Sequence, residues 1–260
     1  MQYVSQKNPM KPPHDRYHEK YMMFVCLIKK NNPTILEIGA HNGADSLRML
    51  YYFEEGKIYS FEPDPRNITV HKKYVNNERC ELFPIALSSN DSEMPFFLPT
   101  SRNVKKVPYK HSWLSEEDYI LTENSASCSL KKSNRKDFEN KSEIIVKTEK
   151  LDTWISDKNI HYIDLIWMDV QGSERDVLLG AINTLPRVSY IWTEYGEKEY
   201  DDAMGRDDTI EFLKKLNFGI VENGSSQGDS GDLLFYNKNI FVHCKISKFK
   251  KDKDGKMLKI

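Results

Sequence analysis

The feature that most constrains the fold is a short apolar run that ends in a glycine turn, followed by a second apolar run that ends in an acid. The first is Thr34-Ile-Leu-Glu-Ile-Gly-Ala-His-Asn-Gly43, and the second is Ser60-Phe-Glu-Pro-Asp64. Such runs are typical of parallel strands, and in parallel sheets ligands bind where the strands end. The glycines let the backbone approach the ligand. The pattern therefore predicts a nucleoside site, with Glu62 accepting hydrogen bonds from both ribose hydroxyls.

The spacing of the glycines argues against a dinucleotide. A dinucleotide fingerprint would place glycines at positions 39, 41 and 44, where this chain has Gly39, His41 and Ala44. No row of amide donors is then left for a pyrophosphate. Glu37 lies inside the first strand, before the turn, where a carboxylate suits a ligand with an ammonium or sulfonium charge. The cofactor that fits this description is S-adenosylmethionine.

Composition argues against several other classes of protein. Lys plus Arg is 38 against 39 for Asp plus Glu, so we expect no nucleic-acid partner. The four cysteines form no CxxC pair, which indicates neither a zinc site nor a disulfide framework and favours a reducing compartment. The apolar run Tyr21–Ile28 is too short to span a bilayer, so we expect no stable membrane insertion. We expect a soluble, cytoplasmic protein.

The chain divides into three parts along its length. Residues 1–33 contain a proline-rich arm and an amphipathic helix over His14–Lys30, where apolar residues recur at helical spacing. Residues 34–240 form the main domain, which a polar insertion interrupts at about 100–142. Lysines are frequent in residues 241–260, which we expect to be a solvated basic tail. The extended termini also fit one part of a larger multidomain enzyme.

Apolar runs and amphipathic segments alternate along the main domain. Strands are predicted over residues 34–40, 57–62, 80–87, 143–148, 163–168 and 188–193. Helices are predicted over 44–54, from Pro65 onward, and over 151–156, 174–185 and 208–216. Residues 218–222 and 232–236 would close the sheet as an antiparallel pair, and Met94–Leu98 would form an extra extended segment. This alternation predicts an α/β fold with a parallel sheet and right-handed crossovers.

Further acids follow the later strands. Asp169 comes directly after the most apolar strand, and Glu194 follows the next one. An acid there loses hydration unless it meets a partner, which favours a function, although Asp169 could instead cap the following helix. Because strand ends of a parallel sheet face one cleft, Asp169 and Glu194 could hold a divalent cation, or one could act as a general base. Glu194 could equally be an exposed acid, and the helix dipole alone could explain Glu174.

Histidine and aromatic residues are further candidates. His41 lies in the glycine turn and could face the cofactor or the acceptor, although most single histidines are structural. Tyr109, His111 and Trp113 lie in the insertion and could stack on a sugar or cover the site. A partly ordered polar loop is the plainer interpretation of that insertion.

An ordered series of motifs resembles the FkbM family of S-adenosylmethionine-dependent methyltransferases. The matching pieces are Leu36-Glu-Ile-Gly-Ala-His-Asn-Gly43, Phe61-Glu-Pro-Asp-Pro65, Pro84-Ile-Ala-Leu-Ser88, Ser127-Cys-Ser-Leu130, Thr148-Glu-Lys-Leu-Asp-Thr153, Ile163-Asp-Leu-Ile-Trp-Met-Asp-Val-Gln-Gly-Ser-Glu174 and Val177-Leu-Leu-Gly-Ala181. The resemblance covers roughly residues 34–238. It implies a class I methyltransferase fold, a Rossmann-like, seven-stranded, mostly parallel sheet with helices on both faces and an antiparallel C-terminal strand.

The resemblance also implies roles for particular residues. The cofactor would be bound by Glu37, Gly39, Ala40, Asn42, Gly43, Ser46, Glu62, Pro63, Ser88 and Asp169. Glu62 would hold the ribose, the Ser88 region would approach the adenine, and Asp169 would lie at the reaction end. Catalysis would depend first on Asp169, then on Glu194, with His41 as a further candidate. Asp169 and Glu194 would be the ligands if Mg²⁺ takes part.

Two positions depart from the family pattern. The family usually has a lysine where this chain has Trp167 and a glutamate where it has Gln171. The first change puts a lysine-dependent acceptor contact in doubt, and the second removes one base or metal ligand. The resemblance still predicts an O-methyltransferase that acts on a hydroxyl of a sugar or glycan. The alternatives are a lipid or another small-molecule acceptor, or a non-catalytic module of a larger glycan-modifying enzyme.

Overall fold

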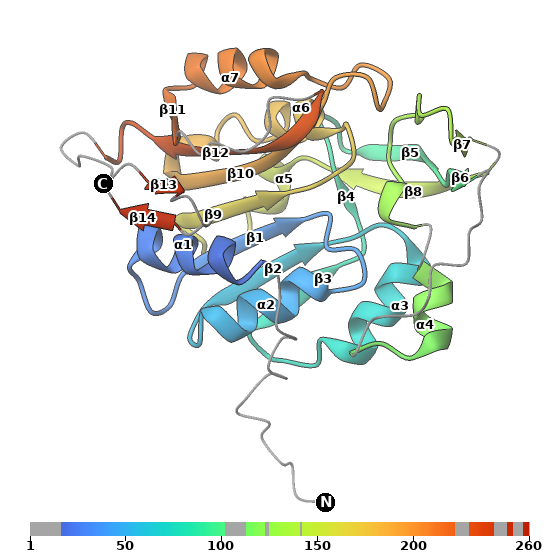
Figure 1. Cartoon of the computed structure of the whole chain (residues 1–260), viewed down its shortest axis with the longest axis horizontal. Coiled ribbons are helices and arrows are strands. Elements are labelled where there is room, and N and C mark those ends of the chain that lie inside the picture. The colour runs from blue at the N-terminus through green and yellow to red at the C-terminus, as the bar shows by residue number, and fades with distance from the viewer. Residues whose placement is uncertain are drawn as a thin grey trace, which may run out of the picture.

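A seven-stranded sheet forms the centre of the molecule (Figure 1). The computed structural model describes residues 17–101, 113–122, 125–140, 142–221, 229–241, 249–251 and 257–259. The strands lie in the order β11 (Phe218–Val221), β12 (Ser230–Asn237), β10 (Val188–Gly196), β9 (Ile163–Met168), β1 (Thr34–Ile38), β2 (Lys57–Phe61) and β3 (Cys80–Phe83). Within this sheet β12 runs antiparallel to both of its neighbours, and the other pairings are parallel. The expected sheet, with its antiparallel strand near the C-terminus, is confirmed.

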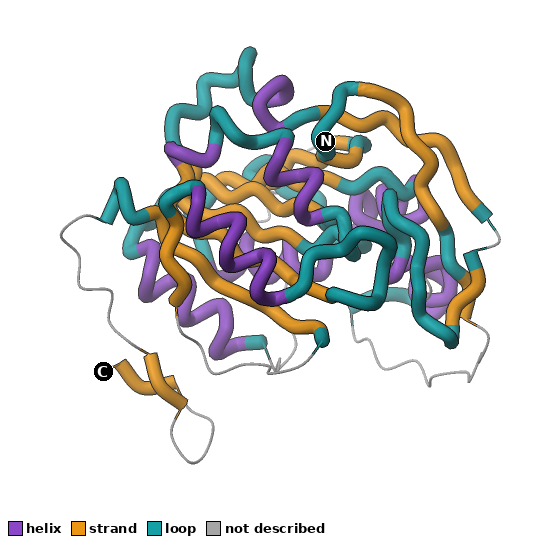
Figure 2. Tube along the Cα trace, turned by 90° about the horizontal axis from the view of Figure 1, so that it is seen from above, coloured by secondary structure: helices purple, strands orange, loops and turns teal. Residues whose placement is uncertain are grey.

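Helices cover both faces of the sheet because side chains alternate along each strand (Figure 1 and Figure 2). Ile35 and Leu165 point to the face that is covered by α1 (His18–Ile28) and α2 (Ala44–Tyr52). Leu36 and Ile166 point to the other face, which is covered by α5 (Leu151–Trp154), α6 (Glu174–Leu179) and α7 (Arg206–Lys215). Both faces of the sheet are therefore buried. A ligand can reach the sheet where its strands end.

The strand that was predicted over residues 80–87 is divided between two sheets. Its second part, β4 (Ala86–Leu87), leaves β3 and joins β8 (Glu143–Glu149) and β5 (Ser92–Phe97) in a three-stranded sheet. Pro84 has no N–H for a ladder hydrogen bond, and Ile85 N donates back to the Phe83 oxygen at 2.9 Å. The chain therefore turns here, and a single strand over 80–87 was wrong. The extended segment that was predicted at residues 94–98 is confirmed for residues 94–97, which belong to β5.

The described part of the insertion is more ordered than a polar loop. It contains β6 (Thr100–Ser101), α4 (Glu116–Thr122), the 3-10 turn η1 (Ser125–Ser127) and β7 (Phe138–Glu139). Asp118 holds α4 against α3 (Pro65–Tyr74), because its Oδ2 accepts from Lys73 Nζ at 2.6 Å and from Tyr74 OH at 2.7 Å. Trp113 packs edge-on against Tyr74, whereas positions 109 and 111 lie outside the described residues. The helix was missed because contacts distant in sequence hold it in place.

Other predicted boundaries shift by a few residues. The helix α6 ends at Leu179 rather than near position 185. Beyond it, the carboxylate of Asp152 accepts the backbone N–H groups of Asn183 and Thr184, and Thr184 N also donates to the Ala181 oxygen at 2.8 Å, so the chain continues in turns instead of a regular α-helix. The C-terminal residues contain an antiparallel pair that was not predicted, formed by β13 (Phe249–Lys251) and β14 (Met257–Lys259). The N-terminal arm at residues 1–13 lies outside the described residues.

The helices and the cysteines were also the subject of predictions from the sequence. No helix in the described ranges combines the length and the hydrophobicity that a membrane crossing requires. Cys26 and Cys80 are free thiols, Cys128 Sγ accepts from Arg66 Nη2 at 3.3 Å, and Cys244 falls outside the described ranges. Burial raises the pKa of both Cys80 and Cys128 to about 12, so these two thiols are not poised as nucleophiles.

Candidate functional site

The turn after β1 brings three strand ends together. Gly39 has a φ of 91°, and a Cβ added there would lie 1.9 Å from the carbonyl oxygen of Asp169. Glycine is therefore what allows the ends of β1 and β9 to approach each other this closely. The N–H groups of Gly39 and Ala40 both donate to the Phe61 oxygen at 3.0 Å, which ties the turn to β2.

Glu62 follows β2 and holds the same turn from its other side. Its Oε2 accepts from His41 N at 2.8 Å, and its Oε1 accepts from Asp64 N at 2.8 Å. The Nδ2 of Asn67 also donates to Oε1, at 3.3 Å. Burial raises the pKa of Glu62 to about 7 even though these donors favour its charged form. The result is a carboxyl group of fixed orientation at the end of β2.

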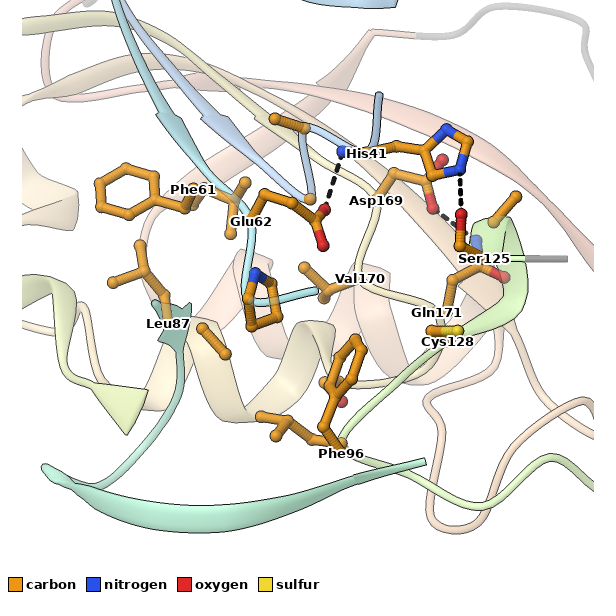
Figure 3. Close-up of a pocket in the computed structure, with 18 of the residues that line it drawn as sticks. His41, Phe61, Glu62, Leu87, Phe96, Ser125, Cys128, Asp169, Val170 and Gln171 are labelled. Carbon is orange, nitrogen blue, oxygen red and sulfur yellow. Dashed lines mark hydrogen bonds between the residues drawn. The ribbon is translucent and has the colours of Figure 1, made fainter. Parts of the chain in front are cut away.

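A cavity opens where this turn, Glu62 and the end of β9 meet (Figure 3). The polar part of its wall includes His41, Asn42, Asp45, Glu62, Ser125 and Asp169. The apolar part includes Phe61, Ile85, Leu87, Phe96, Leu130 and Val170. Figure 3 shows Phe61, Leu87 and Phe96 on the side away from His41 and Ser125. A slot with one apolar and one charged end suits a flat base that is joined to a polar, charged group.

The cavity brings together many, but not all, of the predicted residues. Gly39, Ala40, His41, Asn42, Glu62, Pro63 and Asp169 line it. Gly43 does not, and a Cβ added there would lie 2.5 Å from the Val75 side chain, so this glycine serves packing. Ser88 does not line it either, because it is buried and its N–H donates to the Glu149 oxygen at 2.9 Å. Ile85 to Leu87 take the place that we expected for the Ser88 region.

Glu37 and Ser46 lie beneath the turn rather than in the cavity. Glu37 Oε2 accepts from the hydroxyls of Ser46 at 2.5 Å and Ser60 at 2.6 Å, and Ser46 Oγ also contacts His71 Nε2 at 2.9 Å. The Glu37 carboxyl is fully buried, its Oε1 has no partner among the described residues, and burial raises its pKa to about 8. This corrects the expectation that Glu37 faces the charge of the ligand. It belongs to a buried network that supports the turn.

Asp169 and Glu194 lie close together, as their strand ends predicted. The Nε2 of Gln171 donates to Asp169 Oδ1 at 2.5 Å and to Glu194 Oε2 at 2.8 Å, and its Oε1 accepts from Tyr200 OH at 2.7 Å. Burial, and then the charge of Asp169, raise the pKa of Glu194 far above its usual range. Glu194 therefore holds a proton at neutral pH. Asp169 is the exposed partner, and of these two acids it is the one that lines the cavity.

Glu174 supports the turn that follows β9. Its Oε1 accepts from Val170 N and from Gly172 N, both at 3.2 Å. The turn needs this support because Gln171 and Gly172 both have positive φ, 53° and 92°. Burial raises the pKa of Glu174 to about 7. Glu174 does not line the cavity, so its place indicates a supporting role.

His41 links the glycine turn to the insertion. Its Nε2 lies 2.8 Å from Ser125 Oγ, which also donates to Asn67 Oδ1 at 2.7 Å. Burial lowers the pKa of His41, so the ring is neutral at physiological pH. A neutral ring that is held by a hydroxyl can shape the cavity wall, and it supplies no charge there.

The described residues lend no support to the expected Mg²⁺ site. They contain no group of three or more His, Cys, Asp or Glu side chains arranged to hold a metal ion. The two carboxyl groups that we expected as ligands are bridged by the amide of Gln171, and Glu194 is held in its protonated form. This pair is satisfied by hydrogen bonds.

The insertion and its flanking strand supply a wall of the cavity that was not predicted from the sequence. Phe96 comes from β5, and Ser125, Ala126, Cys128 and Leu130 come from η1 and the segment after it. The motif Ser127-Cys-Ser-Leu130 was a signal for part of this wall. Ser129 from the same motif fixes the segment, because its Oγ donates to the Gln171 oxygen at 2.7 Å.

The chain is similar to several known proteins. The model of the methyltransferase FkbM domain matches residues 37–220. The 2-O-methyltransferase NoeI of Sinorhizobium fredii is 29% identical over 229 residues, which cover 85% of this chain and 86% of NoeI. The fibrillarin/Nop5p complex has a TM-score of 0.45 at 13% identity, covering 80% of this chain and 74% of that one. TrmK of M. capricolum in complex with S-adenosyl-homocysteine has a TM-score of 0.43 at 13% identity, covering 85% and 68%.

The family match includes the turns after β1 and β9, both strand-end acids that line the cavity, and the insertion that closes its wall. Because it spans more than half of the chain, it decides the family, and the resemblance that the motifs indicated is confirmed. The chain belongs to the methyltransferase FkbM domain family and is a methyltransferase.

Proposed function

We propose that the protein transfers a methyl group from S-adenosylmethionine to a hydroxyl group, with the cofactor in the cavity between Glu62 and Asp169. The observation that carries this proposal is the pairing of a fixed carboxyl at the end of β2 with an exposed carboxylate at the end of β9, on one cavity. Glu62 would accept the ribose hydroxyls, and Phe61, Leu87 and Phe96 would enclose the adenine. Asp169 would then lie beside the reacting end.

The cofactor, when bound, supplies a methyl group that its sulfonium already activates. The residues of the chain must align the acceptor oxygen and remove its proton. We assign proton removal to Asp169, because it is an acid that is exposed and forms part of the cavity wall. Glu194 is protonated, and the Gln171 amide links it to Asp169. We therefore propose that Glu194 helps to orient the Asp169 side chain. His41 shapes the wall beside Ser125, and no step requires Mg²⁺.

The acceptor that we propose is an uncharged hydroxyl compound, and a sugar is the first candidate. NoeI, at 29% identity, is named a 2-O-methyltransferase, which supports oxygen as the methylated atom. Asp45, Asp169 and Asp232 place carboxylates at the same end of the sheet, where they would repel a phosphate backbone. This charge favours a sugar or glycan over a nucleic acid.

The test is the release of S-adenosylhomocysteine when the full chain meets S-adenosylmethionine and a panel of sugars. We expect release that depends on the acceptor and persists in the presence of a metal chelator. Mass spectrometry of the product should show a methyl group on oxygen. Cofactor binding without turnover on any hydroxyl acceptor would overturn the proposal, and turnover on RNA alone would overturn the choice of acceptor.

A further inference from the structure

A lysine of the N-terminal helix lies over two tryptophans of the central sheet. The ammonium of Lys20 in α1 is 4.2 Å from the ring centroid of Trp167 and 4.7 Å from that of Trp192. The two indoles stack on each other with centroids 5.7 Å apart, on adjacent strands β9 and β10. An ammonium over the faces of two aromatic rings is held by the charge distribution of both. Lys20 is therefore a fixed cation rather than a mobile surface lysine.

The packing of α1 determines where this cation lies. Tyr21 stacks on Trp167 at 5.4 Å, and Phe24 meets Trp192 edge-on at 5.4 Å. The hydroxyl of Tyr21 donates to Asp45 Oδ1 at 2.5 Å, which joins the first turn of α1 to the first turn of α2. Because Asp45 also lines the cavity, the helix that carries Lys20 is fastened to the cavity wall.

Acidic groups from three elements face this cation. The charges of Asp232 on β12, Asp45 on α2 and Asp169 after β9 all act on Lys20. Arg48 on α2 opposes them, and burial lowers the pKa of Lys20. Asp232 pairs with Glu194 in the β10–β12 register, so these two side chains lie on one face of the sheet. Lys20 thus lies among acids at the ends of β9, β10 and β12, with Arg48 as a second cation nearby.

We propose that Lys20 is a positioning residue of the acceptor site, whose fixed ammonium attracts the carboxyl groups of Asp169 and Asp232 and holds them in place for the acceptor hydroxyl. Neighbouring carboxylates repel each other, and one of them takes up a proton unless a cation balances the charge. Glu194 already shows this outcome. Lys20 lies over Trp167, two residues before Asp169, so its positive charge offsets this repulsion on the side of the acid that would remove the proton. The inference rests on the proposed function, and it extends the site to a helix that precedes the family match at residues 37–220.

The experiment compares Lys20→Met, Lys20→Gln and Lys20→Arg with the wild-type chain. We expect kcat to fall about tenfold in both uncharged variants, while the affinity for S-adenosylmethionine stays unchanged. Lys20→Arg should restore most of the rate, because it keeps the charge over the indoles. The acidic limb of the pH–rate profile should move to higher pH in Lys20→Met. Two uncharged variants keep the test valid if one of them folds poorly.

A matched control and a readout independent of turnover complete the design. Lys158 also lies over an indole, 5.0 Å from the Trp154 centroid, but it pairs with Asp157 and does not line the cavity. Lys158→Met should leave the rate unchanged. Burial raises the pKa of Asp232 and Lys20 lowers it, so carboxyl NMR of Lys20→Met should show a higher Asp232 pKa.

The outcomes separate this inference from the proposed function. Wild-type chain that binds cofactor but methylates no hydroxyl would defeat the proposed function, whatever the Asp232 titration shows. An active wild type with unchanged rate and pH profile in Lys20→Met would defeat the role of Lys20 alone. An equal loss in Lys20→Arg and Lys20→Met, or in Lys158→Met, would also defeat it.

Discussion

The turns after β1 and β9 are each fastened by a buried glutamate that accepts two backbone N–H groups, but Glu62 lies after β2 and takes only one of its two, His41 N, from the β1 turn. Glu62 takes His41 N and Asp64 N at 2.8 Å, and Glu174 takes Val170 N and Gly172 N at 3.2 Å. Burial raises the pKa of both to about 7. Of the two, Glu62 is the one that lines the cavity. An acid that follows a strand is thus a candidate for ligand binding only where its carboxyl group also lines a cavity.

The largest effect should come from the exposed acid on the β9 side. Asp169→Asn keeps the hydrogen bond from Gln171 but removes the charge, so turnover should fall at least about 100-fold, as expected for loss of a general base. Cofactor affinity should stay nearly unchanged. Initial rates of S-adenosylhomocysteine release and calorimetry measure the two quantities. Asp176→Asn, on α6 and paired with Lys131, is the control, and unchanged turnover in Asp169→Asn would remove that residue from the mechanism.

Glu174 should affect how the free energy of unfolding depends on pH. Folded Glu174 keeps its proton up to about pH 7, whereas the unfolded chain loses it near 4.5. The folded state therefore binds more protons between these values, and its stability falls as pH rises, by up to about 3 kcal/mol. In Glu174→Gln, this loss of stability between about pH 4.5 and pH 7 should be absent. Urea unfolding at several pH values measures it, with the exposed Glu81→Gln as control; identical pH profiles for Glu174→Gln and wild type would contradict the assignment.

A smaller loss of cofactor affinity is expected from a change at Ser125, where the insertion contacts the turn after β1. Ser125→Ala removes the hydrogen bond to His41 Nε2, and one neutral hydrogen bond contributes about 1 kcal/mol. The dissociation constant for the cofactor should rise about fivefold, which calorimetry can resolve. Ser127→Ala in the same 3-10 turn should leave that constant unchanged. Equal constants for Ser125→Ala and wild type would mean that the contact does not shape the cavity.

The sequence revealed the β1 side of this comparison more clearly than the β9 side. Local sequence patterns predicted the glycine turn, Glu62 and the parallel strands, because hydrophobic periodicity and turn-forming residues are properties of neighbours in the chain. The same patterns placed Glu37 at the ligand. They could not show that Ser46 and Ser60, which reach Glu37 from other elements, would keep it buried.

The rest of the site depends on contacts between distant segments. Gln171 was interpreted as the loss of an acid, yet its amide joins Asp169 to Glu194. Trp167 was interpreted as the loss of a lysine, yet its ring lies under Lys20 from the N-terminal helix. A side chain in one element acquires its meaning from the element that packs on it, and periodicity along the chain carries no information on that partner.

Calorimetric titration of S-adenosylmethionine into Glu62→Gln and Glu174→Gln, at pH 8, tests the central claim most directly. The two variants remove the same charge from buried glutamates that both accept backbone N–H groups of a strand-end turn, but of the two only Glu62 lines the cavity. The account predicts at least a tenfold loss of affinity in Glu62→Gln, in line with a charge-assisted hydrogen bond, and less than about a twofold change in Glu174→Gln. Unchanged affinity in Glu62→Gln, or equal losses in both variants, would contradict the placement of the cofactor between Glu62 and Asp169.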